Sequence, residues 1–296
     1  MTKKEIFNLN QETKLYKELS KIYGESFDEL LIELVKIHNK YEKNGIITYN
    51  EMQKYDRFNS LLSQINGELT KIAKVTKAEI INNLTETYQF NYLYQSFLFE
   101  GLAGVAVATS LIPKKQVLAA IQNPIKNLTL SNRLEKNRKE IIRKTKKELT
   151  KGLIKGLSMK QMTKNIQSLY DNDINKAKRI VQTETTRNAN AGTNESYKDA
   201  MRKGIEFEEI WVATLDKKTR KEHRKLDGVA KDEKGYWYIG NDKARYPGDF
   251  SKAENSINCR CSTIAQLKGI ALTGRRVRNE GIGKYKTYEQ WKNNLE

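Results

Sequence analysis

Two cysteines and one histidine are the residues whose types and spacing could do chemistry in this chain. Cys259 and Cys261 are the only cysteines among 296 residues, and a single arginine separates them. His223, one of only two histidines, lies a short way upstream. Thiolates and imidazole are the ligands that zinc takes in tetrahedral protein sites, and a thiol beside an imidazole is also the nucleophile and base of thiol enzymes.

The metal hypothesis needs a fourth ligand. Asp227 is the candidate that we include with His223, Cys259 and Cys261, and Asp216 is an alternative. Structural zinc cysteines are usually separated by two to four residues, so a Cys-x-Cys pair is a tighter arrangement. The competing interpretation is that the cysteines are half-buried strand residues and that His223 hydrogen-bonds Asp227 or a backbone carbonyl. Zinc is the one cofactor that the sequence suggests.

Two enzymatic interpretations use the same residues. In a thiol enzyme, Cys259 would be the nucleophile and His223 the base, but the sequence identifies no orienting third residue and no oxyanion site. In a metal-dependent nuclease, His223, Asp216 and Asp227 would bind the ion, but they form no recognisable signature. We therefore predict no catalytic residues and a protein that is not an enzyme.

Composition points to an anionic partner. Lys and Arg total 54 against 36 Asp and Glu, which gives a net charge of +18 and a pI near 9.6. Such a charge favours nucleic acid, an acidic protein surface or anionic lipid. Two cysteines exclude a disulfide framework and indicate a reducing compartment, and the first residues contain no apolar leader segment.

The most apolar stretch, residues 97–112, is too short to be a membrane span. Glu100 interrupts it and Pro113 ends it, whereas a spanning helix needs about 20 apolar residues. We expect a buried helix or an interface segment, and no stable membrane insertion.

Apolar periodicity predicts helices over the first hundred residues. Residues 30–38 and 61–75 follow the stripe of one helical face, and the aromatic-rich run 78–99 is expected to form a third helix. His38 lies on the first stripe, so we expect it to be a packed residue. The aromatic run contains almost no Lys or Arg, so we expect its rings to be core residues and not a base-stacking surface.

Residues 131–151 form the most basic predicted helix. They include nine Lys or Arg against three Glu, with a thin apolar seam and Ser131 as the expected N-cap. The basic face is either a solvated surface with i,i+4 ion pairs or a phosphate-binding surface, and the local charge favours the second. The DNA-binding candidates, including three tail residues, are Arg133, Lys136, Arg138, Lys139, Arg143, Lys144, Lys146, Lys147, Arg275, Arg276 and Arg278.

The pattern changes from helical to strand-like at residue 205. A helix is expected to start after Ser158, and residues 171–173 lead into a second, longer helix from Ile174 to about Lys203, which Gly204 terminates. Strands are expected at 205–213, 234–240 and 261–267, with a turn at 246–249. The fold class is therefore α+β, with a long mainly helical region followed by a small β-containing module. The predicted divisions are 1–112 (N-terminal helical region), 113–204 (helices including the basic helix 131–151), 205–267 (β module) and 268–296 (basic tail).

Four landmarks in a fixed order carry a family resemblance. They are Gln182 to Gly192 on a helix, Trp211 to Asp216, His223 to Gly228, and Pro247-Gly248-Asp249 leading to Asn258-Cys259-Arg260-Cys261. In this order they resemble the Mu F-like family of tailed-phage minor head, or head morphogenesis, proteins, over roughly residues 110–267. The motif residues that we expect to be structural are Glu184, Arg187, Asn190, Asp216, Asp227, Gly228, Asn258 and Arg260.

The chain departs from the family pattern at two places. Gln182 stands where the family often has Arg, and Arg220 and His223 stand where many members have a Cys-x-x-Cys pair. A four-cysteine zinc site is therefore not available. Glu184 and Arg187 are three residues apart and share a helical face, so we expect them to act as an architectural clamp between helix and β module.

The resemblance implies a structural protein of the phage head. Such a protein associates with the portal during assembly, contacts packaged double-stranded DNA nonspecifically and is released with the DNA on ejection in some members. Its expected location is the virion interior near the portal, and the host cytoplasm during assembly. The portal protein and DNA are the expected partners, with scaffold and major capsid proteins as further candidates. A nucleic-acid-acting enzyme and a free nucleic-acid-binding protein stay as alternatives.

Overall fold

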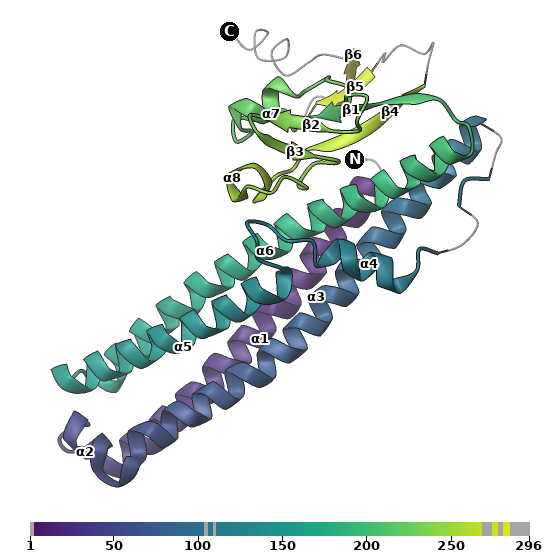
Figure 1. The fold of residues 1–296 in the computed structure, drawn as a ribbon. Coiled ribbons are helices and arrows are strands. Elements are labelled where there is room, and N and C mark those ends of the chain that lie inside the picture. Colours follow the sequence, from purple (N-terminus) through teal and green to yellow (C-terminus); the bar gives the residue numbers. More distant parts are fainter. Residues whose placement is uncertain (1–2, 104–105, 109–110, 268–273, 278–280, 285–296) are drawn as a thin grey trace. The chain divides into compact units, whose positions relative to one another are not determined.

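The computed structural model describes residues 3–103, 106–108, 111–267, 274–277 and 281–284. Its long helices are α1 (Lys3–Tyr41), α3 (Arg57–Ala103), α5 (Leu130–Lys155) and α6 (Met159–Arg202), and its short ones are α2 (Tyr49–Gln53), the 3-10 helix η1 (Lys54–Asp56) and α4 (Lys114–Ile121). Strands follow only after α6 (Figure 1). The predicted α+β class is therefore confirmed.

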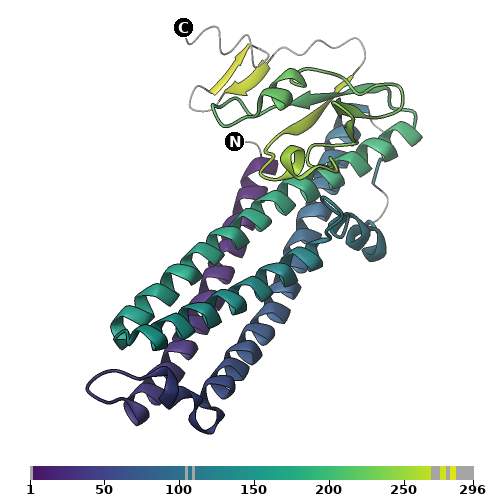
Figure 2. The same ribbon diagram turned by 60° about the vertical axis from the view of Figure 1, so that its left-hand side comes forward.

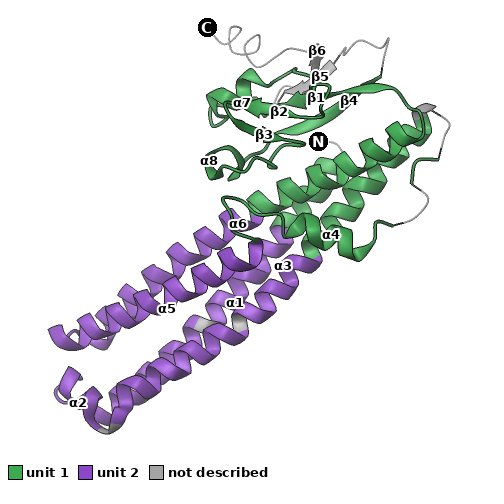
Figure 3. Cartoon of the chain, in the orientation of Figure 1, with its two compact units in different colours: residues 1–12, 83–129, 182–296 green, residues 13–82, 130–181 purple. Residues whose placement is uncertain are grey.

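The chain divides into two compact units (Figure 3). Unit 1 comprises residues 1–12, 83–129 and 182–296, and unit 2 comprises 13–82 and 130–181. Because α1, α3 and α6 each contribute residues to both units, the units do not follow the linear divisions expected from the sequence.

Unit 2 is built from helices that run alongside one another around an apolar core (Figures 1 and 2). The helix α5 buries a stripe of Ile141, Thr145, Leu149 and Leu153 at the spacing of one helical face. The core also contains Leu34, Leu61, Leu69, Ile166 and Tyr170.

Helix boundaries in unit 2 correct one prediction and confirm another. The helix α5 begins at Leu130, so Ser131 lies in its first turn and is not the N-cap. The helix α6 begins as expected, because Ser158 Oγ accepts a hydrogen bond from Gln161 N while Ser158 N donates to Gln161 Oε1. This reciprocal pair is a capping box.

The helix α3 differs from its prediction in two ways. The runs 61–75 and 78–99 belong to one continuous helix of 47 residues, because no helix breaker separates them. The helix ends at Ala103, and in the chain beyond it Val107 N and Ala108 N donate hydrogen bonds to Glu100 Oε1. Residues 97–112 are therefore not one buried helix, and Phe97 is exposed whereas Phe99 is buried.

No helix in the described part of the chain is long and apolar enough to cross a membrane. Several aromatic residues of the 78–99 run are core residues, as expected, including Tyr88, Tyr92 and Phe99. His38 is partly buried, and its Nε2 lies 3.3 Å from the carbonyl oxygen of Gly45.

Unit 1 contains the β module. The strand β1 (Phe207–Val212) pairs antiparallel with β4 (Ser262–Leu267), with Phe207 opposite Leu267 and Val212 opposite Ser262. A second antiparallel pair joins β2 (Trp237–Ile239) to β3 (Asp242–Ala244), and a third joins β5 (Gly274–Val277) to β6 (Gly281–Lys284). The short helices α7 (Lys221–Lys225) and α8 (Ala253–Ser256) lie between strands in sequence.

The predicted strands are present, although each is shorter than its prediction. The core of the module is formed by Trp211, Trp237, Phe250 and the two cysteines. Gly204, with φ of +82°, ends α6 as expected, since a residue without a Cβ adopts this conformation at little cost. The two helices expected between Ser158 and Gly204 are, however, one continuous helix.

Candidate functional site

His223, Cys259 and Cys261 meet in the core of the β module. The Nδ1 atom of His223 lies 3.6 Å from Cys259 Sγ and 3.5 Å from Cys261 Sγ. The three potential ligand atoms all lie within 4.8 Å of one another, and all three residues are buried. The structure therefore brings together the scarce residues that the sequence singled out.

The geometry of the Cys-x-Cys segment explains how both thiols reach the core. Asn258 has a φ of +57° and turns the chain, and the residues after it lead into β4. Alternate residues of an extended chain point to opposite sides. Cys259 and Cys261 accordingly face inward, while Arg260 pairs with Asp216 through both guanidinium Nη atoms.

The two carboxylates considered as metal ligands are engaged elsewhere. Asp227 Oδ1 accepts a hydrogen bond from Ala213 N at 2.8 Å. Asp216 accepts from Arg260 and Thr219 and from Lys218 N, and its hydrogen bonds with Arg260 lower the pKa of Asp216 to about 2. Within the described residues, neither aspartate belongs to the thiol–imidazole cluster. The expectation that Asp227 completes the ligand set is therefore wrong.

The first landmark forms a buried ion pair on α6. Arg187 Nη1 lies 3.2 Å from Glu184 Oε2, and both side chains are almost fully buried. Arg187 Nε also donates to the carbonyl oxygen of Gly248 at 2.7 Å, and Nη1 donates to that of Asn123 at 3.1 Å. This pair joins the helix to two loops of unit 1.

The same face of α6 holds the cysteine segment. Asn190 Nδ2 donates to the carbonyl oxygens of Pro247 and Cys261, at 3.2 and 2.9 Å. Thr183 Oγ1 accepts from Asn258 N at 3.1 Å. Gly228, with φ of +79°, donates its N–H to Trp211 O. The landmarks thus form one hydrogen-bonded frame around the cluster.

Sequence reasoning missed Asp242, which organises the loop before the cysteines. Its carboxylate accepts hydrogen bonds from Ser251 N and Oγ, Lys252 N and Asn255 Nδ2. Burial alone would raise the pKa of Asp242, but these hydrogen bonds hold it below its usual value. The local sequence gave no sign of this role, because the hydrogen-bond partners of Asp242 follow about ten residues later.

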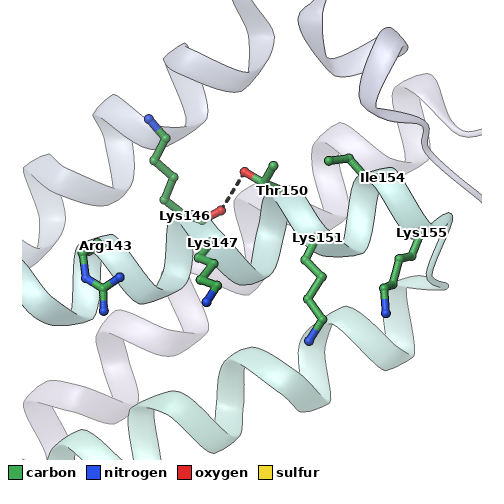
Figure 4. Close-up of a pocket in the computed structure, with 7 residues that line it drawn as sticks. All are labelled: Arg143, Lys146, Lys147, Thr150, Lys151, Ile154 and Lys155. Carbon is green, nitrogen blue, oxygen red and sulfur yellow. Dashed lines mark hydrogen bonds between the residues drawn. The ribbon is translucent and has the colours of Figure 1, made fainter.

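The second candidate surface lies on α5 in unit 2. Arg143, Lys147, Lys151 and Lys155 repeat at four-residue spacing, so they follow one face of the helix about 6 Å apart. They are exposed, and with Lys146, Thr150 and Ile154 they line a surface hollow (Figure 4). Within the described residues, no carboxylate pairs with Lys146, Lys147 or Lys155, whereas Arg143 pairs with Glu140 and Lys151 with Glu148.

The predicted DNA-binding residues differ in their surroundings. Arg138 is half-buried and donates to Glu135, Asn66 and Thr70, so its guanidinium is occupied within unit 2. Lys136 and Lys139 are exposed, Arg133 and Lys144 are partly buried, and Lys144 pairs with Glu140. The list missed Lys151 and Lys155, which the four-residue repeat could have identified. Arg275 and Arg276 lie in β5, and Arg278 lies outside the described residues.

Comparison with known proteins places this architecture in a family. Residues 143–264 match the model of the family described as Phage Mu protein F like protein. Minor head protein GP7 of Bacillus phage SPP1 is 30% identical over 285 residues, which cover 94% of this chain and 92% of that protein. The chain therefore belongs to the Mu F-like family of phage minor head proteins. The relationship extends through the N-terminal hundred residues, where no motif could be recognised.

A second relative is named as an enzyme. The NAD(+)--arginine ADP-ribosyltransferase EFV of Enterococcus faecalis is 26% identical over 276 residues, which cover 93% of this chain but only 56% of that protein. No solved structure matches the chain.

Proposed function

We propose that this minor head protein associates with the portal during head assembly and binds packaged DNA nonspecifically through the basic face of α5. The observation that carries the DNA proposal is the stripe of Arg143, Lys147, Lys151 and Lys155, opposite the buried stripe of the same helix. Cations in a row on a rigid helix contact phosphates without reading bases. A net charge of +18 supports a partner with a high density of negative charge.

The DNA proposal is tested by replacing the stripe. The variant carries Arg143→Gln, Lys147→Gln, Lys151→Gln and Lys155→Gln, and the control carries Lys14→Gln, Lys17→Gln, Lys21→Gln and Lys40→Gln, exposed residues of α1. Both variants lose the same charge. Fluorescence anisotropy with two unrelated duplexes should show affinity at least about tenfold weaker for the stripe variant, and a salt slope reduced by about 3 to 4 if all four cations meet phosphates. If both variants lose the same DNA affinity, binding depends on the total charge of the chain and not on the basic face of α5.

The portal proposal is supported by family membership and is tested on assembled particles. The chain should co-purify with portal rings when the two proteins are produced together, and it should be present in a few copies per virion. Release with the DNA predicts that the chain is depleted from emptied particles after ejection. Absence from both procapsids and virions would contradict the head assignment and favour a free nucleic-acid-binding protein.

We further propose that the chain acts without catalysis. In support, His223, Cys259 and Cys261 are buried away from substrate, and the carboxylate of Asp216 is paired with Arg260. The relative named as a transferase extends well beyond the region that matches this chain. DNA cleavage with divalent metal and ADP-ribosylation of arginine with NAD should both stay at background. Cleavage that His223→Ala abolishes would overturn the non-enzymatic proposal.

A further inference from the structure

We propose that His223, Cys259 and Cys261 bind a zinc ion inside the β module, with Nδ1 of the histidine as the nitrogen ligand. The proposal rests on three features of the cluster: the distances among its ligand atoms, the hydrogen-bonding capacity of one nitrogen, and burial. It does not depend on the DNA or portal proposals.

The distances match a tetrahedral zinc site. Bond lengths of about 2.3 Å to sulfur and about 2.05 Å to nitrogen at the tetrahedral angle place S and N ligands about 3.5–3.6 Å apart. The observed Nδ1–Sγ separations are 3.6 Å for Cys259 and 3.5 Å for Cys261. Both nitrogen–sulfur separations therefore already match the spacing that the ion requires, and all three ligand atoms lie within 4.8 Å of one another.

Hydrogen bonding alone does not account for this arrangement. An imidazole Nδ1 carries either one hydrogen or one lone pair in the ring plane, so it makes one good hydrogen bond. Here it lies equally close to two sulfurs. An ion bound between the three atoms satisfies both contacts at once.

Burial favours a neutral cluster, which zinc provides. A divalent ion with two thiolates and one neutral imidazole has no net charge, so placing it among Trp211, Trp237 and Phe250 costs little in desolvation. The imidazole is also held by aromatic packing, since its ring lies 5.7 Å from that of Trp211. The frame from α6 fixes the other side, where Asn190 holds the carbonyl oxygen of Cys261.

The fourth position is open to a non-protein ligand. Within the described residues, no further His, Cys, Asp or Glu joins the cluster. Arg220, the residue directly before α7, stands one helical turn from His223, and its guanidinium donates to the carbonyl oxygen of Ile257. Three protein ligands and a water molecule are the arrangement of catalytic zinc sites, but here the burial of all three ligands keeps substrate from the ion. The substitution Arg220→Cys would offer a third thiolate as the fourth protein ligand.

Metal content of the full chain tests the proposal. Protein produced with zinc and then dialysed should contain about one zinc ion per chain, as measured by inductively coupled plasma mass spectrometry. His223→Ala and Cys259→Ser should reduce zinc to background, whereas His38→Ala, which removes the other histidine, should retain it. His223→Cys should also retain zinc, because it keeps a soft ligand at the same place.

Two readouts separate a lost ligand from a lost fold. Cobalt(II) in the unmodified protein should give thiolate-to-cobalt charge-transfer absorption and the strong d–d bands of a tetrahedral site. Arg220→Cys should slow the loss of zinc to a chelator at least about tenfold. Folded unmodified protein without zinc and without the cobalt spectrum would overturn the proposal, as would an ion other than zinc. The stripe variant of α5 should keep its zinc, so a failure of the DNA proposal can be distinguished from a failure of the zinc proposal.

Discussion

The two ends of α6 show contrasting ways to bury a helix. In unit 2, residues 159–181 bury an apolar stripe that includes Met162, Ile166, Tyr170 and Val181. In unit 1, residues 182–197 are buried on almost every side although most of them are polar. The first end needs only apolar neighbours, whereas the second end needs particular hydrogen-bond partners.

This contrast predicts different responses to substitution. An apolar stripe tolerates changes that keep volume and polarity, because dispersion and the hydrophobic effect have no direction. A buried polar face does not, because each partner left without a hydrogen bond costs free energy. The predictions below test the contrast, beginning with the largest expected effect.

Glu184→Ala should destabilise the protein by about 3–5 kcal/mol, because it leaves the buried guanidinium of Arg187 without its counter-charge. Urea denaturation followed by circular dichroism measures the loss. The double variant Glu184→Leu/Arg187→Met should lose less than the single variant, since no unpaired charge remains. If Glu184→Ala is as stable as the unmodified protein, the buried polar face tolerates substitution as well as the apolar stripe does, which contradicts the contrast.

Two helical glycines, one in each unit, form a matched pair. A Cβ at Gly192 would lie 2.2 Å from the carbonyl oxygen of Tyr88, which is backbone. A Cβ at Gly152 would lie 2.7 Å from Cγ of the flexible Met162 side chain and at an ordinary 3.9 Å from Leu157 Cδ1. Gly192→Ala should therefore cost more than about 2 kcal/mol, whereas Gly152→Ala should stay within about 1 kcal/mol because helix propensity favours alanine. Thermal unfolding of both variants checks the difference, and equal effects would contradict it.

The Asp216–Arg260 pair should make the β module sensitive to acid. The pKa of Asp216 is lowered to about 2 in the folded protein by Arg260, so the unfolded chain takes up the proton first as pH falls. The stabilising contribution is complete above pH ~4 and is lost between pH ~4 and ~2; it amounts to about 1 kcal/mol at this partly exposed pair. Urea titrations at several pH values should give a shallower acid dependence for Asp216→Asn. If the free energy of unfolding of Asp216→Asn depends on pH as steeply as that of the unmodified protein, this pair does not cause the acid sensitivity.

Lys147→Gln should have the smallest effect on folding. Its ammonium group is exposed on α5 and contacts no carboxylate in the described part of the chain, so the free energy of unfolding should change by less than about 0.5 kcal/mol. A larger change in thermal unfolding would show that the basic face also stabilises unit 2.

Apolar stripes and helix ends are the kinds of structure that sequence predicts well. Periodicity identified the helices, and Ser158 and Gly204 marked the ends of α6 through chemistry contained in the local sequence. Periodicity could not show that residues 61–75 and 78–99 form one helix. The apolar spacing identifies each run as helical but does not say whether the residues between the runs are helical as well. The capping preference of Ser131 also placed the first residue of α5 at position 132, two residues too late.

The polar end was predictable as a motif but not as a set of contacts. The order of the landmarks indicated that Glu184, Arg187 and Asn190 are structural. Arg187 and Asn190, however, also donate to backbone carbonyls of Asn123, Gly248 and Pro247, which no residue type reveals. For the same reason Asp227 was expected at the metal cluster, although its carboxylate accepts the N–H of Ala213.

The burial of Cys259 and Cys261 gives the molecule an internal probe of its own opening. They are the only thiols in the chain, and each is 3% exposed. A thiol reagent in native buffer can reach them only when the β module opens, so the labelling rate measures the equilibrium between closed and open forms. Site-directed labelling usually requires engineered cysteines, but here the natural sequence places both reporters beneath the frame that α6 provides.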